Sequence, residues 1–213
     1  ENGCEDQPCF ADAPQPGPSL LTVTAAEEAS ALSDAEIGHL QFIREEEKMA
    51  RDVYLVLYEA WGSPVFLNIA ASEQRHMDAM ARLLDFYGIE DPVTSDEIGA
   101  FTDPDIRDLY GDLVSRGLES EAEAMRAGGC IEEYDIADIW LAYDETDEIR
   151  IQRVYENLYE GSYNHLDAFV HNYELLTGEV YVQQLLSAEE FAYVMAFETR
   201  ARQSQQSAGQ GGR

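Results

Sequence analysis

Residues 47–54 read EKMARDVY, and residues 133–140 read EYDIADIW. Each stretch begins with a carboxylate, which is followed three positions later by an apolar residue, five positions later by an aspartate, six positions later by a β-branched residue and seven positions later by an aromatic residue. A second matched pair follows, because residues 68–80 read NIAASEQRHMDAM and residues 157–169 read NLYEGSYNHLDAF. The duplication indicates two similar helix pairs, each with a glutamate on one helix and a histidine on the next.

The remaining pattern predicts helices along most of the chain. Ser33 and Glu36 form a capping box, and apolar residues then recur at helical spacing with Glu47 among them. A strand is indicated only at residues 179–182. The expected helices cover residues 33–61, 63–87, 103–116, 119–143, 147–176 and 187–202.

Four of these helices are long, and we expect them to pair as two antiparallel hairpins joined by a long crossover that contains the short helix. The predicted fold is therefore all-α, a four-helix bundle with a C-terminal helix and extended termini. We expect an extended arm over residues 1–32, the bundle over 33–178, a C-terminal helix packed on the bundle over 179–203 and a flexible tail over 204–213.

The composition limits the classes of partner. The formal net charge is −30, which disfavours nucleic acid and anionic membranes because phosphates would be repelled. Such a charge favours cations as ligands. The sequence has no apolar run long enough to span a membrane. The chain begins with glutamate and a polar stretch, so we expect an exported protein at an extracellular or cell-surface location.

Three cysteines are present. Cys4 and Cys9 are close enough in sequence to form a small disulfide loop, which would leave Cys130 over. The remaining cysteine would then be a buried thiol or the site of an intermolecular bridge. Their spacing is unlike that of the usual zinc-binding cysteine pairs.

The histidines and glutamates of the duplicated segments indicate a metal site. Glu73 and His76 form a Glu-x-x-His motif, whose two side chains share one helix face. In the other half His165 is matched, but Ser162 stands where the motif would have a glutamate. Metal sites in bundle cores use one glutamate from each of two helices and Glu-x-x-His from each of the other two.

These phrases also resemble known families. EKMARDVY resembles the first iron-binding helix of rubrerythrins, and the arrangement of glutamate and histidine helices is similar to that of the ferritin-like superfamily. REEEKMARDVYLVL, NIAASEQRHMDAM, IEEYDIADI and GSYNHLDAF resemble more specifically the ferritin-like domain of unknown function 2202. The resemblance covers roughly residues 35–175 and implies a ferritin-like bundle with a metal centre.

The resemblance also implies a set of ligands. Ser162 departs from the superfamily pattern, so a mononuclear site remains an alternative to a di-iron site. Possible additional ligands are Glu46, Glu132 and Glu160. Residues expected to contact the ligands without binding the metal themselves are Asp78, Asp167 and Ser162. The ligand positions carried over are Glu47, Glu73, His76, Glu133 and His165.

The leading hypothesis is an exported, acidic metal-binding protein. Mixed carboxylate and imidazole ligands suit one or two ions of iron, with manganese or zinc as alternatives. A di-iron centre would imply ferroxidase or peroxidase-like oxidoreductase chemistry. The rival hypothesis is a structural subunit that self-assembles into a filament or surface layer, as a homo-oligomer or polymer, through its N-terminal arm, Cys130 and tail. A third is an acidic surface that binds cations or mineral.

Overall fold

The computed structural model describes residues 32–197. The five labelled helices are α2 (Asp34–Trp61), α3 (Pro64–Tyr87), α4 (Pro104–Gly117), α5 (Glu121–Asp144) and α6 (Ile149–Thr177). A further helix covers residues 188–197. The described part contains no strand, so the predicted all-α fold is confirmed and residues 179–182 belong to a loop.

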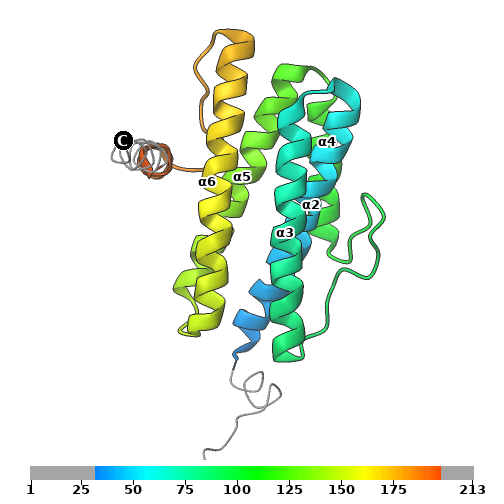
Figure 1. Ribbon diagram of the computed structural model, residues 1–213, viewed down its shortest axis with the longest axis vertical. Helices are drawn as coiled ribbons and strands as arrows, with labels where there is room; N and C mark the ends of the chain where they lie inside the picture. Colours follow the sequence, from blue (N-terminus) through cyan, green and yellow to red (C-terminus); the bar gives the residue numbers. More distant parts are fainter. Residues whose placement is uncertain (1–31, 198–213) are drawn as a thin grey trace, which may run out of the picture.

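The four long helices stand side by side as two hairpins (Figure 1). Helix α2 packs along α3, and α5 packs along α6. The hairpins meet where α2 contacts α5 and where α3 contacts α6, so α2 and α6 lie on opposite corners of the bundle. Helix α4 belongs to the crossover and packs against α2 and α5. Each long helix therefore has one face turned toward a common interior.

Glycines end three of the long helices. Gly62, Gly88 and Gly178 follow α2, α3 and α6 with φ angles of 68°, 66° and 74°. This left-handed conformation suits glycine because a Cβ atom would clash there.

Two predicted boundaries differ from the structure. Helix α4 ends at Gly117, one residue later than expected, with Leu118 as its capping residue. A Cβ atom at Gly117 would lie 2.6 Å from Leu57 Cδ2, so glycine allows the close approach of α4 to α2. Helix α6 begins two residues later than expected, since Glu148 occupies the capping position. The Thr146 hydroxyl accepts a hydrogen bond from the Glu148 amide and donates one to the Glu36 carboxylate.

The glycine pair in α5 marks a close contact between helices and loop. Gly128 packs against Phe169 of α6, where an added Cβ would lie 2.5 Å from the ring. Gly129 packs against Tyr181, where an added Cβ would lie 2.4 Å from the hydroxyl. Helix α5 continues through both glycines, so their small size serves packing.

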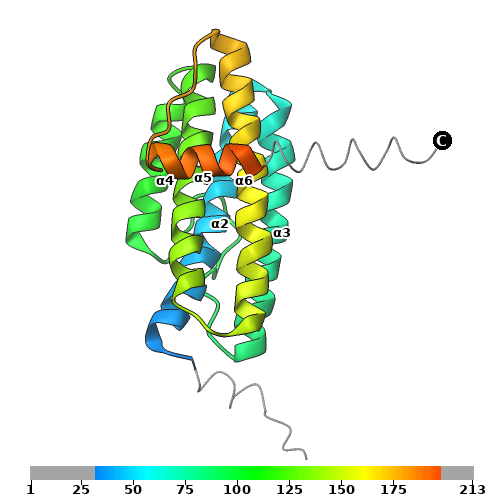
Figure 2. The same cartoon turned by 90° about the vertical axis from the view of Figure 1, so that its left-hand side faces the viewer.

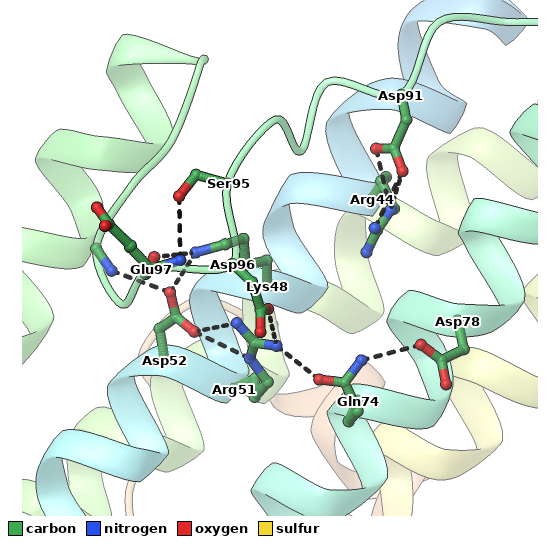
Figure 3. A network of polar contacts seen from close by, with 11 residues as sticks. Arg44, Lys48, Arg51, Asp52, Gln74, Asp78, Asp91, Ser95, Asp96 and Glu97 are labelled. Atoms are coloured by element: carbon green, nitrogen blue, oxygen red, sulfur yellow. Dashed lines mark hydrogen bonds and ion pairs between the residues drawn. The ribbon is translucent and has the colours of Figure 1, made fainter.

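The connector between α3 and α4 is fixed to α2 by a polar network (Figure 3). Lys48 donates to Asp52 at 2.5 Å and to the backbone oxygen of Glu97 at 2.8 Å. Arg51 also donates to Asp52, and it reaches Asp96 of the connector at 2.7 Å. This network gives the long crossover a defined position on the outer side of α2.

The helix of residues 188–197 crosses the long helices (Figure 2). Ser187 and Glu190 form a capping box at its start. Val194 is fully buried, and Tyr193 lies against Trp140 of α5. The helix of residues 188–197 thus packs against α5 through these side chains.

Several predictions fall outside the described residues, including the arm over residues 1–31, the whole tail over residues 204–213 and the pairing of Cys4 with Cys9. Cys130 is a half-buried free thiol whose pKa is raised by burial. The search of the described residues found no helix with the length and hydropathy needed to cross a bilayer.

Candidate metal centre

Acidic and imidazole side chains from all four long helices meet in the bundle interior. They come from Glu47 of α2, Glu73 and His76 of α3, Glu132 of α5 and His165 of α6. The three glutamates are at most 2% exposed. Because each long helix turns one face inward, residues far apart in the sequence come within ligand distance of one another.

The first group consists of Glu47, Glu73 and His76. Nδ1 of His76 lies 2.8 Å from Oε2 of Glu73 and 3.2 Å from Oε2 of Glu47. Each residue offers an atom within 4.8 Å of the others, a spacing that allows one cation to be held between them. This group joins the two helices of the first hairpin.

The second group consists of Glu73, Glu132 and His165. Nδ1 of His165 lies 2.8 Å from Oε1 of Glu73 and 3.4 Å from Oε2 of Glu132. Glu73 belongs to both groups and turns one oxygen toward each histidine. The ring centroids of His76 and His165 are 5.6 Å apart, so the two groups are adjacent.

Several polar atoms of this interior lack a hydrogen-bond partner. They include Oε1 of Glu47 and Oδ1 of Asp135, while Oε1 of Glu73 and Nδ1 of His165 have only their ion pair with each other. Buried polar atoms are rarely left unsatisfied, since an unpaired carboxylate oxygen costs several kcal/mol. Buried oxygen and imidazole nitrogen atoms that face one another without hydrogen bonds are a donor set that fits divalent cations.

The glutamates of the interior are not neutralised by arginine or lysine. Within the described residues, every ion pair of Glu47, Glu73 and Glu132 is with His76 or His165. Burial raises the pKa of Glu47 well above its usual range, and it also raises the pKa of Glu132. The carboxylates would therefore hold protons unless another cation replaced them.

The two histidines, by contrast, are stabilised in their charged, protonated form. Burial alone would lower the pKa of His76, but the carboxylates of Glu47 and Glu73 outweigh it and raise this pKa to about 12. For His165 the same competition, with Glu73 and Glu132 as neighbours, gives a pKa of about 10. Glu73 lies between both imidazoles, which lower its pKa despite its burial. In the absence of a metal ion, protons would supply the positive charge.

Neighbouring residues hold this arrangement in place. The Tyr54 hydroxyl donates to Oε1 of Glu132, which fixes the carboxylate from the side away from His165. Gly161 of α6 leaves room for the imidazole of His76, because a Cβ atom at this position would lie 2.7 Å from Nε2. Tyr54, a fully buried core residue, is thus also part of the site.

Glu133, predicted as a ligand, lies outside both groups. Its side chain is fully buried, but it accepts hydrogen bonds from the Tyr181 hydroxyl and from the amides of Gln184, Leu185 and Leu186. These bonds satisfy the carboxylate and hold the loop that leads to the C-terminal helix. The structure gives Glu133 a structural role, and Glu132 takes the interior position.

The difference arises from the register of the two hairpins. The sequence repeat aligns Glu47 with Glu133, whereas the interior faces of α2 and α5 align Glu47 with Glu132. The spacing of residues along α5 could have indicated Glu132, because Gly128, which packs against Phe169, is followed by inward-facing residues at intervals of four, three and four. On α5 this seam is Gly128, Glu132, Asp135 and Ile139.

Three further candidates do not reach the two groups. Glu46 is buried beside Glu47 but faces α5, where its carboxyl forms a hydrogen bond with Asp138 and burial raises its pKa well above the usual range. Glu160 is exposed on α6. Asp78 is also exposed, and it accepts a hydrogen bond from Gln74.

Ser162 lies beside the two groups, but its hydroxyl contacts Asp135 and none of their members. It is fully buried, and its hydroxyl donates to Oδ2 of Asp135. Asp135, which the sequence analysis did not single out, is 4% exposed. Asp167, expected to support a ligand, is half-buried on α6.

A model of the family described as "Uncharacterized protein domain (DUF2202)" matches residues 36–198. The chain belongs to this family. The resemblance drawn from the sequence phrases is thereby confirmed, and the match includes every residue of the two groups.

A member of similar sequence is the uncharacterized protein MJ0754 of Methanocaldococcus jannaschii. It is 46% identical over 171 residues, which make up 79% of this chain and 90% of that protein. The crystal structure titled hypothetical protein MJ0754 from Methanococcus jannaschii superposes with a TM-score of 0.75 and covers 78% of this chain and 94% of its own. Neither name states a ligand, so the chemistry of this DUF2202 site is argued from its geometry.

Proposed function

We propose that the protein binds metal ions in the bundle interior, through a carboxylate and histidine centre that holds one or two ions of iron. The single observation that carries this proposal is the pair of buried groups that share Glu73 and have no arginine or lysine partner. A cation bound there would satisfy oxygen and nitrogen atoms that otherwise lack partners.

The donor set favours iron or manganese, and zinc is the alternative, because carboxylates and imidazoles together suit these ions. With two ferrous ions bound, such a centre supplies chemistry with dioxygen or peroxide of the ferroxidase or peroxidase-like kind. In this role Glu73 would contact both ions and each histidine would hold one. Tyr54 would keep the Glu132 carboxylate oriented through its hydrogen bond.

Anaerobic reconstitution with Fe(II), followed by metal analysis and thermal unfolding, tests the proposal. We expect bound iron in the wild-type chain and a raised unfolding temperature, since a ligand at a hundred times its dissociation constant stabilises the fold by about 2.7 kcal/mol. Both effects should disappear in the double variant His76→Ala with His165→Ala.

The matched control is the double variant His39→Ala with His171→Ala, which removes the same number of imidazoles outside the centre. His39 pairs with Glu145 near the end of the bundle, and His171 is exposed on α6. Iron binding that is absent from the wild type, or that survives loss of His76 and His165 unchanged, would show that the proposal is wrong.

The proposal includes an extracellular or cell-surface location, supported by the net charge of −30. Cell fractionation of the native host tests it, and recovery of the chain only with the cytosol would contradict it. The rival hypothesis of a self-assembling subunit depends largely on residues 1–31 and 198–213, which lie outside the described part. The described interior favours the metal-binding proposal.

A further inference from the structure

Helix α6 lacks a carboxylate that helix α3 has. In α3 the motif supplies Glu73 together with His76, while in α6 the residue three positions before His165 is Ser162. The two groups therefore share one carboxylate, Glu73, and the opposite side of the interior has a hydroxyl where a second shared carboxylate would stand. A carboxylate from another helix could occupy this side.

Asp135 of α5 lies in the required place. It follows Glu132 by three residues, so both side chains project from the same face of the helix. Its Oδ2 accepts the hydrogen bond of the Ser162 hydroxyl, which ties the carboxylate to the helix that carries His165. Its Oδ1 is buried and has no partner.

Asp135 is also close to members of both groups. Its carboxylate interacts electrostatically with Glu132 and Glu73 and with His76. It is likewise among the neighbours that act on Glu47 of the first group. Asp135 is thus a buried carboxylate with one oxygen held by Ser162 and the other without a hydrogen-bond partner, and it interacts electrostatically with both histidine groups.

The charges of the interior agree with two ions. Glu47, Glu73, Glu132 and Asp135 together carry four negative charges when ionised, which two divalent cations would balance with both histidines neutral. With one divalent cation, two of these charges would have to be balanced by protons, which would then occupy ligand atoms of the centre. Glu46, on which Asp135 also acts, is left out of this balance because its carboxyl forms a hydrogen bond with that of Asp138, and two carboxyl groups can do so only when one of them carries a proton.

We propose that Asp135 is the second shared carboxylate, so that the centre holds two divalent cations with Glu73 on one side and Asp135 on the other. Ser162 orients Asp135 and thereby replaces the glutamate that α6 lacks. This inference rests on the proposed function, since it specifies how many ions the centre holds and which residue completes it.

The test is titration of the metal-free full-length protein with Fe(II) under anaerobic conditions, and separately with Mn(II). We expect two ions per chain in the wild type. The Asp135→Asn variant should retain one ion, with the affinity for the second lowered by about 100-fold or more, because loss of even an outer ligand partner costs 10- to 100-fold. The matched control is Asp138→Asn, which removes the same charge one turn further along α5 and should still bind two ions.

Two further measurements separate a ligand from a structural residue. Adding Ser162→Glu to the Asp135→Asn variant restores a carboxylate to the same side and should recover the second ion. In electron paramagnetic resonance, Mn(II) bound to the wild type should show the signal of a coupled pair, whereas the Asp135→Asn variant should show the hyperfine pattern of an isolated ion.

The outcomes distinguish this inference from the proposed function. A wild type that binds no metal overturns both. A wild type with a single ion, or an Asp135→Asn variant that binds two ions with unchanged affinity, overturns the assignment of Asp135 and leaves metal binding in place. If Asp135→Asn fails to fold, Ser162→Ala serves instead; we expect about 10-fold weaker binding of the second ion, and unchanged binding overturns the assignment.

Discussion

Helix α2 buries charged residues on two sides, and the two sides are neutralised differently. On the side of the connector, Asp52 is fully buried and accepts hydrogen bonds from Lys48 and Arg51 (Figure 3). On the interior side, Glu47 is buried to the same degree, and its ion pair is with His76. One side contains its own fixed cations, and the other depends on protons or on ions from solution.

The single lysine of the chain belongs to the connector side. Lys48 is completely buried, although lysine is normally an exposed residue. With so few basic residues in a chain of net charge −30, the placement of Lys48 and Arg51 on the outer side of α2 leaves the interior carboxylates without a permanent counter-charge. A buried acidic residue with a fixed cation beside it, such as Asp52, stabilises the fold, whereas one without a fixed cation, such as Glu47, is available to bind a ligand.

The largest effect is expected from removing a cation on the connector side. Lys48→Met leaves the Glu97 backbone oxygen without its donor and Asp52 with reduced compensation, so the metal-free protein should lose about 3 kcal/mol or more of its unfolding free energy. Urea unfolding in the presence of a chelator measures it. Arg107→Met, which removes an exposed cation, is the control and should change stability by less than about 0.5 kcal/mol. Equal effects of the two substitutions would contradict the description of the network.

The pH dependence of the metal-free protein gives a second, intermediate effect. Burial together with Glu132 and Glu73 raises the pKa of Asp135 to about 7, and the pKa of His165 is about 10. A group whose pKa is raised by folding keeps its proton to a higher pH in the folded chain than in the unfolded chain. Its contribution to the unfolding free energy is therefore complete at low pH and is lost as the pH rises through the folded-state pKa. Stability should therefore fall between about pH 5 and pH 9, by up to about 1.4 kcal/mol per pH unit for each retained proton.

Thermal unfolding across this range, with and without Fe(II), provides the measurement. Metal ions compete with protons for the same atoms, so the stabilisation by Fe(II) should grow as the pH rises. A metal-free protein whose stability increases steadily from about pH 5 to pH 9 would contradict the assignment of an uncompensated interior.

The smallest effects come from neutralising one glutamate on each side of α2, and they should differ in sign. Burial raises the pKa of Glu47 well above its usual range, so at about pH 8 folding of the metal-free chain must either protonate this carboxyl group or bury its charge. Glu47→Gln removes that cost, so the metal-free protein should gain about 1 kcal/mol while losing affinity for Fe(II). Glu45→Gln weakens the acceptor of two backbone amides, those of Thr102 and Asp103, and should lose about 1 kcal/mol. Chemical unfolding of both variants decides the matter, and a loss of stability in each would remove the proposed difference between the two sides.

Local patterns in the sequence were sufficient for most of the fold. The capping box at Ser33 and Glu36 and the glycines that end α2, α3 and α6 act through neighbouring residues, so they can be recognised in the chain. The Glu-x-x-His motif is equally local, since residues three apart share a helix face, and it correctly placed Glu73 and His76 together.

Local patterns in the sequence could not decide whether Glu132 or Glu133 faces the bundle interior. Both glutamates are buried, and the duplication favours Glu133. The rotation of α5 against α2 depends on contacts that the sequence repeat does not show, including the approach of Phe169 to Gly128. A rotation by one residue turns a side chain by about 100°, enough to exchange an interior position for a loop contact.

The sequence by itself determined that the chain is helical, that it is duplicated, and that glutamate and histidine would face one another in a bundle. Those properties follow from periodicity and spacing along one chain. Only the tertiary structure decided that Glu73 is shared by two groups, that Glu133 holds the C-terminal loop, and that Asp135 lies opposite beside Ser162. These arrangements depend on how four helices turn relative to one another, which is set by packing between residues far apart in the chain.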